Sequence, residues 1–251
     1  MLLTATAATF ALAAITGGAY PRADSLLGTG VSRALATARA AQIRDVRYAL
    51  SFDLTERDSS RGTMTARFRV TKPGDVILDF RGQRLGKVEV NGAVLLSPQF
   101  NGAHVSIPAQ SIVTGENVVT MAFVARIAAA GASIIRYRDA TDGAEYLYTL
   151  LVPADANQLF PCFDQPDLKA KVSLRLRAPA NWRVLANGPE TSSRGADDGY
   201  ATEHEFAETE PISTYLIAFA AGPWATVTSA SSKRPITMYV RKSRAAEAEG
   251  D

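Results

Sequence analysis

The chain has 251 residues, of which 47% are hydrophobic and 21% charged, a composition typical of a globular protein with a large core. Its formal net charge of +2, without a basic run interleaved with aromatic residues, argues against nucleic-acid binding. A single cysteine, Cys162, excludes an intramolecular disulfide framework and a cysteine-rich zinc site.

The first segment of the chain is apolar and carries no charged side chain in its first 20 residues. Leu2 to Ile15 is an alanine-rich run, short for a membrane span, which needs about 20 apolar residues. Small residues follow it, so we expect a signal peptide over residues 1–19, cleaved near Ala19, and an exported protein, periplasmic or extracellular. No Lys or Arg precedes the run, which leaves an uncleaved N-terminal anchor as the alternative. No later segment is apolar enough to span a membrane.

Residues 20–45 are expected to form an N-terminal extension that ends in a short helix. Ser32 suits a helix N-cap, because its hydroxyl can accept a hydrogen bond from an unpaired N–H group of the first turn. Leu35 and Ala38 recur at helical spacing, with Arg39 on another face. This spacing predicts a helix from about Ser32 to Gln42.

The hydrophobic period then changes to two, which is typical of strands with one face on a core. Apolar and polar side chains alternate in residues 47–55 and 62–70, and the polar stretch between them predicts a hairpin. Asn91-Gly92 favours a type I′ hairpin turn because both residues tolerate positive φ, and Asn101-Gly102 repeats this signal. Further strand-like segments are residues 76–80, 87–95, 116–126, 144–152, 170–179, 182–190, 201–208, 214–222 and 236–242.

These segments amount to about a dozen short strands and one or two short helices. The pattern predicts an all-β fold, an antiparallel sandwich or saddle-like twisted sheet. No linker is long enough to divide it, so we expect a single β domain over residues 46–240. From Lys242 the sequence becomes polar, and we expect residues 241–251 to be the truncated start of a further domain.

The candidate metal and catalytic residues do not form a recognisable site. His104 and His204 are about 100 residues apart, whereas zinc hydrolases place two histidines one helical turn apart. His204-Glu205 begins like H-E-x-x-H but lacks the second histidine, and no G-x-S-x-G nucleophile turn or phosphate-binding glycine loop is present. We therefore expect ordinary strand histidines and neither a metal site nor a catalytic residue in this chain.

One segment, Leu159–Lys171, combines two prolines, two phenylalanines, the cysteine, two aspartates and two lysines in its sequence "LFPCFDQPDLKAK". Its cysteine, Cys162, has no Lys, Arg or His immediately beside it to lower its pKa, so we expect a buried, unreactive thiol. Asp164 and Asp167 could form a carboxylate pair, but aspartates beside proline more simply cap and turn the chain. The residues by themselves favour a structural corner between two strands.

Residues 146–189 resemble the aminopeptidase N family of zinc metallopeptidases, which includes the leukotriene hydrolases. The family pattern there is roughly T-Q-x-E-x-x-x-A-R-x-x-F-P-C-F-D-E-P-x-x-K-A. This sequence matches it at Phe160, Pro161, Cys162, Phe163, Asp164, Pro166, Lys169 and Ala170. The resemblance extends over roughly residues 32–240 and implies the N-terminal β-saddle domain of the family, in which the motif residues are structural.

The resemblance also implies what this chain lacks. In the family a catalytic domain follows, with G-x-M-E-N to grip the substrate and H-E-x-x-H to hold zinc and activate water. Neither motif occurs here, so we expect the chain alone to be inactive and without a cofactor. Zinc and the peptide substrate would then belong to a missing catalytic domain, of which residues 241–251 would be the start.

One departure from the family concerns the substrate cleft. The family's T-Q-x-E lends the cleft a Gln for the substrate backbone and a Glu for the free α-amino group. The matching positions here are Leu150 and Val152, both apolar. The resemblance therefore implies weakened selection for a free N-terminus. The alternative is that both are ordinary strand residues.

Three functions remain open at this point. The first is the N-terminal domain of an exported aminopeptidase-N-like zinc peptidase, which walls the cleft and exposes an apolar surface toward the missing domain. The second is a free-standing, non-catalytic β domain of the same descent that binds peptide or protein. The third, a carbohydrate-binding sandwich, needs exposed aromatic residues, and the alternation places most aromatic residues toward the core.

Overall fold

The computed structural model describes residues 26–229 and 236–248, so the predicted leader over residues 1–19 lies outside the described residues. The helices are α1 (Arg33–Gln42), α2 (Ala156–Leu159) and α3 (Ala245–Ala248), with 3₁₀ turns η2 (Ala109–Ser111), η3 (Thr214–Leu216) and η4 (Lys242–Arg244). The strands are β1 (Ile43–Asp53), β2 (Ser59–Val70), β3 (Val76–Asp79), β4 (Arg84–Val90), β5 (Ala93–Val94), β6 (Gln99–Phe100), β7 (His104–Ile107), β8 (Gly115–Ala128), β9 (Ile134–Arg138), β10 (Glu145–Thr149), β11 (Ala170–Pro179), β12 (Arg183–Ala186), β13 (Glu190–Gly195), β14 (Ala201–Phe206), β15 (Phe219–Gly222), β16 (Ala225–Ser229) and β17 (Ile236–Val240). None of these helices is long and apolar enough to cross a membrane.

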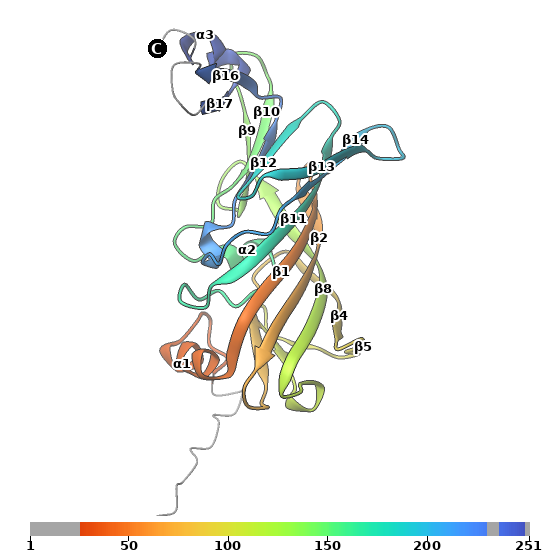
Figure 1. The fold of residues 1–251 in the computed structure, drawn as a ribbon, viewed down its shortest axis with the longest axis vertical. Coiled ribbons are helices and arrows are strands. Elements are labelled where there is room, and N and C mark those ends of the chain that lie inside the picture. The colour runs from red at the N-terminus through yellow and green to blue at the C-terminus, as the bar shows by residue number, and fades with distance from the viewer. Residues whose placement is uncertain (1–25, 230–235, 249–251) are drawn as a thin grey trace, which may run out of the picture.

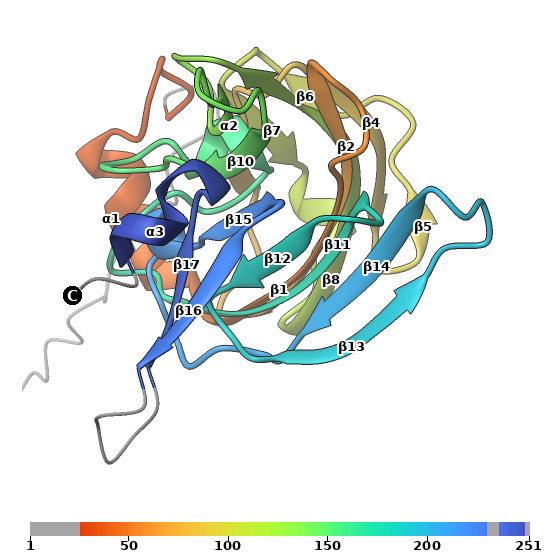
Figure 2. The same ribbon diagram turned by 90° about the horizontal axis from the view of Figure 1, so that it is seen from above.

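Most strands belong to one strongly curved twelve-stranded sheet, which confirms the predicted all-β class (Figures 1 and 2). Its order is β12-β15-β10-β9-β8-β2-β1-β11-β14-β13, with β4 and β5 attached beside β8. Most pairings are antiparallel, but β1 pairs with β11 and β8 with β9 in parallel. A three-stranded sheet, β3-β7-β6, and the β16-β17 hairpin complete the described part.

The alternation predicted for the first hairpin is present. Tyr48, Leu50 and Phe52 of β1 point into the core, and β2 pairs with β1 as an antiparallel partner. The small sheet is different, because β3 and β7 are buried at every residue. Strand β3 has the main core on one face, through Leu78, and helix α1 on the other, through Ile77.

Helix α1 begins as predicted. The Ser32 hydroxyl accepts a hydrogen bond from the N–H of Leu35 at 3.1 Å, and the helix ends at Gln42, directly before β1. The expectation that Arg39 lies on another face than the apolar residues was wrong, because its side chain is buried against β3. Its guanidinium donates to the carbonyl of Ile77, so α1 is fastened to the small sheet by a charged group.

Two loop expectations had different outcomes. Asn91 and Gly92 both have positive φ, 51° and 83°, in the tight turn that joins β4 to β5, as predicted. Residues 214–222 were expected to form one strand, but the first half is the 3₁₀ turn η3 and only Phe219–Gly222 is a strand. Side chains take the place of ladder partners there, since Asn187 bonds to the backbone on both sides of Ile217.

Candidate functional site

A buried polar cluster lies behind the Leu159–Lys171 segment. Arg39 donates two hydrogen bonds to the carboxylate of Asp79, at 2.7 and 2.6 Å, and the His104 ring contacts the same carboxylate through Nδ1 at 2.8 Å. The backbone N–H of Asp164 donates to it at 2.9 Å. Burial by itself raises the pKa of Asp79, but the His104 hydrogen bond and the charge and hydrogen bonds of Arg39 outweigh it. The pKa of Asp79 therefore lies below its usual value.

Asp164 is fully engaged in holding the corner. Its carboxylate accepts hydrogen bonds from the backbone and side-chain N–H groups of Asn157, at 3.1 and 2.6 Å, and from the Thr214 hydroxyl at 2.7 Å. Asp167 is exposed, so the two aspartates sit in different environments and do not act as a matched acid–base pair. Gln165 is buried and donates to the carbonyl of Ala36 in α1.

The apolar residues of the segment are inside the protein. The rings of Phe160 and Phe163 pack edge-on against Tyr48 and Phe68, with centroids 5.4 and 5.3 Å apart. The Phe163 N–H donates to the Tyr48 hydroxyl at 2.9 Å. Pro161 is also buried, whereas Pro166 and Lys169 are exposed. The segment thereby connects α1, β1 and β3.

Cys162 is buried among these groups and pairs with Asp79 through two backbone hydrogen bonds. Burial raises the pKa of the Cys162 thiol, and the negative charges of Asp164 and Asp79 raise it further. A protonated, enclosed thiol is a poor nucleophile. The geometry thus offers no reactive cysteine at this corner.

Leu150 and Val152 lie at the surface immediately after β10. Their side chains are 55% and 61% exposed, and Tyr148 at the end of β10 is 38% exposed, whereas Leu151 between them is buried. The three exposed residues alternate with Thr149, which is half-buried, and Leu151. We call Tyr148, Leu150 and Val152 the apolar row. Its backbone is fixed by the Leu150 N–H, which donates to the carbonyl of Ser133 at 2.9 Å.

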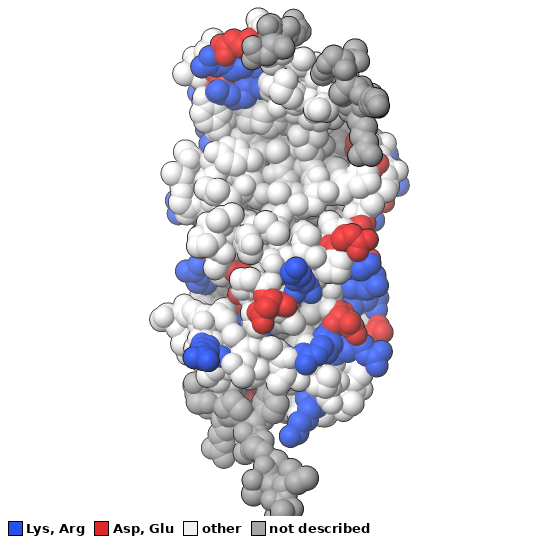
Figure 3. Space-filling model, turned by 60° about the vertical axis from the view of Figure 1, so that its left-hand side comes forward, with Lys and Arg blue, Asp and Glu red and all other residues white. Residues whose placement is uncertain are grey.

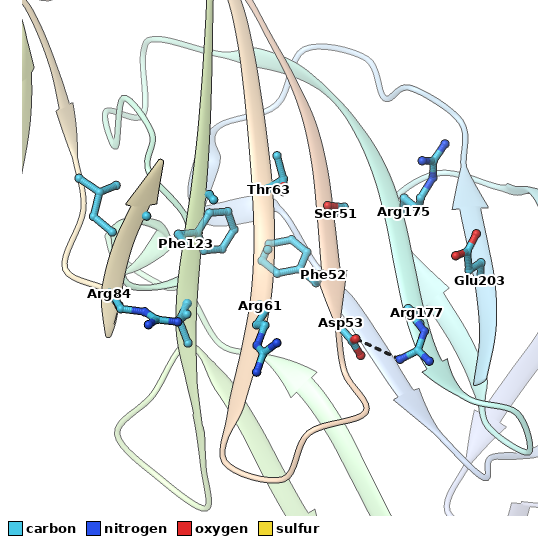
Figure 4. A pocket seen from close by; sticks show the side chains of 15 residues that line it. Ser51, Phe52, Asp53, Arg61, Thr63, Arg84, Phe123, Arg175, Arg177 and Glu203 are labelled. Atoms are coloured by element: carbon cyan, nitrogen blue, oxygen red, sulfur yellow. Dashed lines mark hydrogen bonds and ion pairs between the residues drawn. The ribbon is translucent and has the colours of Figure 1, made fainter. Parts of the chain in front are cut away.

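A hollow of about 620 Å³ lies on the outer face of the curved sheet, across β1, β2, β8 and β11 (Figure 4). Most of its charged side chains are in ion pairs, within the hollow or with neighbouring residues. Arg177 contacts Asp53 at 3.0 Å, and Arg175 contacts Glu205 at 2.7 Å. Surface ion pairs of this kind contribute little energy and are common on solvated sheet faces, so they do not mark a catalytic centre.

The histidines do not form a metal site. His104, in the small sheet, contacts Asp79. His204 lies in β14 of the large sheet and contacts Glu190 at 2.7 Å. No group of three or more His, Cys, Asp or Glu residues that could hold a metal occurs within residues 26–229 and 236–248. The residues present therefore do not fit the zinc that the family resemblance implies, and no step of a reaction can be derived from zinc in this chain.

Comparison with known proteins decides the family. The sequence model of the peptidase M1 N-terminal domain matches residues 46–216. The chain belongs to the peptidase M1 N-terminal domain family. Aminopeptidase N of Streptomyces lividans is 30% identical over 233 residues, which cover 89% of this chain and 26% of that protein. This M1 domain is also 37% identical over 98 residues to glutamyl aminopeptidase of Sus scrofa, covering 39% of the chain and 10% of that protein.

The aligned part of the chain thus covers about a quarter of the length of the Streptomyces enzyme and a tenth of the glutamyl aminopeptidase. The sequence predicted the structural corner but not the Arg39–Asp79 pair, and the role of Leu150 and Val152 stays a prediction. The available signal was an aspartate, Asp79, in the otherwise apolar strand VILDF, because a buried carboxylate needs a charged partner.

Proposed function

We propose that the chain is the N-terminal domain of an exported, aminopeptidase-N-like zinc metallopeptidase. In this proposal it walls the substrate cleft of a catalytic domain that lies outside the chain. The observation that carries the proposal is the exposed apolar row of Tyr148, Leu150 and Val152 in a member of the M1 N-terminal domain family. Contiguous exposed apolar side chains of this kind usually mark a surface that meets a ligand or another protein.

The chemistry of the row defines what it can recognise. Leu150 and Val152 offer methyl groups and neither a carboxylate nor an amide, so they cannot neutralise an ammonium group. An uncompensated ammonium is costly in a half-buried cleft, whereas an apolar or acylated group is accepted there. We therefore expect the cleft to select only weakly for a peptide's free N-terminus.

A second candidate function is a free-standing β domain that binds peptide or protein without catalysis. Leu150 and Val152 favour this candidate too, because a domain that does not bind a substrate's α-amino group needs no carboxylate at these positions. The two proposals differ in metal content. The first requires zinc in the complete protein, and the second requires none.

The deciding experiment begins with the gene. Sequencing the gene and its transcript past the codon for Asp251 is expected to show a frame that continues into G-x-M-E-N and H-E-x-x-H. The complete encoded protein should then contain one zinc per chain by metal analysis and hydrolyse peptides, with loss of hydrolysis after chelation. A stop codon directly after Asp251 would overturn the first proposal and leave the binding domain.

Export rests on the apolar leader and has its own test. Expression in a bacterial host, followed by fractionation and N-terminal sequencing, is expected to give a protein outside the cytoplasm that starts near residue 20. An unprocessed protein retained in the cytoplasm would contradict export without bearing on the cleft.

A further inference from the structure

The dipeptide Asn-Gly occurs twice within a short stretch of the chain. Asn91-Gly92 joins β4 to β5, and Asn101-Gly102 follows β6 in the loop before β7 (Figure 2). Asparagine before glycine is chemically labile, because glycine has no side chain to hinder its backbone nitrogen from approaching the asparagine amide. Both asparagines are exposed, and a Cβ atom at either glycine would meet no atom within 4 Å. A difference in reactivity must therefore come from the way each asparagine side chain is held.

The side chain of Asn91 is tied to other elements. Its Nδ2 donates hydrogen bonds to the carbonyl of Ser111 and to Oδ1 of Asn117, both at 3.0 Å. Its Oδ1 accepts a hydrogen bond from the N–H of Val118 at 2.9 Å. These partners lie 20 to 27 residues further along the chain, so the amide is held against β8 and the loop before it. The Gly92 nitrogen could reach this amide only if these bonds broke.

The side chain of Asn101 folds back onto its own loop. Its Oδ1 accepts hydrogen bonds from the backbone N–H groups of Ala103 and His104, at 2.9 and 2.7 Å. The bond to Ala103 closes an Asx turn, a ring of atoms that contains both the Asn101 Cγ and the Gly102 nitrogen. In the part of the chain that the structure describes, neither the Asn101 Nδ2 nor the Gly102 N–H has a hydrogen-bond partner.

This arrangement favours attack of the Gly102 nitrogen on the Asn101 amide. Negative charge develops on Oδ1 when a nitrogen adds to Cγ, and two N–H groups already point at that oxygen. Donors placed in this way stabilise the tetrahedral intermediate of acyl transfer. Because the nucleophile and the carbonyl belong to one small ring, little further entropy is lost in bringing them together. At Asn91 the bonds of the side chain oppose the same step.

We propose that Asn101 is a site of spontaneous modification, at which the chain converts its own asparagine. The Gly102 nitrogen attacks Asn101 Cγ, a new C–N bond forms and the Cγ–Nδ2 bond breaks. The proton of the Gly102 N–H leaves with Nδ2 as ammonia. Water then opens the resulting cyclic imide at either carbonyl, which gives aspartate or iso-aspartate. The step involves no oxidation, and the inference does not depend on the proposed function.

The modification would be felt beyond the loop. The carbonyl of Ala103 accepts a hydrogen bond from the N–H of Phe80 at 2.8 Å, and the His104 ring contacts Asp79. Iso-aspartate lengthens the main chain by one methylene group directly before these contacts. The loop then cannot keep both contacts together with the pairing of β6 and β7. We therefore expect the converted protein to hold β7 less firmly against β3.

Incubation of the complete encoded protein at mildly alkaline pH tests the proposal, once in buffer and once in guanidinium chloride. Both asparagines fall in one tryptic peptide, residues 88–126, so fragment masses must distinguish them. In the folded protein Asn101 is expected to convert at least about tenfold faster than Asn91. In guanidinium chloride the two rates should converge, because the dipeptides are the same. Equal rates in the folded protein, or a folded protein in which neither asparagine converts while both convert in guanidinium chloride, would overturn the proposal.

Asn101→Asp separates the reaction from its effect on stability. The variant keeps a side-chain oxygen that can accept both N–H groups but has no amide to lose as ammonia. Before incubation it is expected to unfold at the wild-type temperature. After long incubation the wild type should show a lower Tm and iso-aspartate at position 101, whereas the variant should keep its Tm. An equal fall in Tm in both proteins would overturn the proposed effect on β7.

Discussion

Asp79 shows how a single buried charge organises the corner of this domain. The carboxylate is almost fully enclosed, and its partners come from helix α1, strand β7 and the Leu159–Lys171 segment. Breaking a buried ion pair is more costly than never forming it, because the remaining charge stays buried without compensation. The three elements therefore depend on one residue for their mutual position.

Asp79→Asn is expected to destabilise the folded chain by about 3–5 kcal/mol at pH 7, because Arg39 loses its counter-charge. The pKa of Asp79 is lowered in the folded state, so its stabilising contribution is complete above the unfolded value of about 3.9 and is lost as the pH falls below it. Urea unfolding between pH 7 and pH 3 should show a smaller loss of stability in the variant than in the wild type. Glu210→Gln, at an exposed carboxylate, should behave like the wild type. Parallel pH profiles for Asp79→Asn and the wild type would contradict this role.

Val152→Glu supplies the carboxylate that the apolar row lacks. In the complete protein we expect the ratio of kcat/KM for a free-amine substrate to that for its N-acetylated form to rise about tenfold to hundredfold, as for a charged hydrogen bond of about 1.5–3 kcal/mol. Val113→Glu is the matched control, since Val113 is also exposed but lies in the loop before β8. An equal kcat/KM ratio in both variants would show that Val152 does not line the substrate cleft.

At the scale of elements, the packing of two aromatic rings across β1, β2 and β8 depends on a position without a side chain. Gly62 in β2 lies opposite Phe52 on one neighbouring strand and Phe123 on the other. The two rings meet edge-on with centroids 5.6 Å apart. A Cβ atom at Gly62 would come within 2.4 Å of the Phe123 ring, so the glycine leaves the space in which the rings pack.

Gly62→Ala is expected to cost roughly 1–3 kcal/mol, because the added methyl group must displace an aromatic ring from a filled core. Thermal unfolding should show a clear fall in Tm. Gly195→Ala in β13 is the control, since its Cβ would meet no atom within 4 Å and its φ is not in the left-handed region. That variant should unfold at or slightly above the wild-type temperature. A Tm for Gly62→Ala equal to that of the control would show that the ring pair tolerates the methyl group.

At the scale of the whole molecule, the surface differs in chemistry from one part of the domain to another. In Figure 3, charged side chains gather in the lower half of the face drawn and at its upper end, and few lie between. The outer face of the sheet carries many paired charges, whereas the apolar row exposes tyrosine, leucine and valine. Exposing these apolar side chains to water costs free energy. The natural state of the row in the proposed enzyme is to be covered.

The chain from residue 20 onward is therefore expected to self-associate when it is produced without a following domain. Leu150→Ser combined with Val152→Ser should shift sedimentation profiles toward the monomer at high protein concentration, because the exposed apolar area becomes smaller. Val113→Ser removes a similarly exposed valine away from the row and should leave association unchanged. A wild-type chain that stays monomeric at high concentration would count against a covered surface.

The sequence by itself determined the features that depend on neighbours along the chain. The alternation in β1 and β2, the Ser32 cap and the Asn91-Gly92 turn are set by backbone sterics and local hydrogen bonds, and each is present. The F-P-C-F-D-x-P motif likewise identified the family before any contact was known. These signals survive because a short segment carries all the information that its conformation requires.

Only the tertiary structure decided which distant segments meet. Arg39 pairs with a carboxylate 40 residues away, β1 pairs in parallel with β11, and the Phe163 N–H donates to the hydroxyl of Tyr48 in β1. The sequence pattern placed Arg39 on another helix face than the apolar residues, because periodicity alone does not show which face another element covers. Pairing of this kind is selected by the free energy of the whole core, in which each contact depends on all the others.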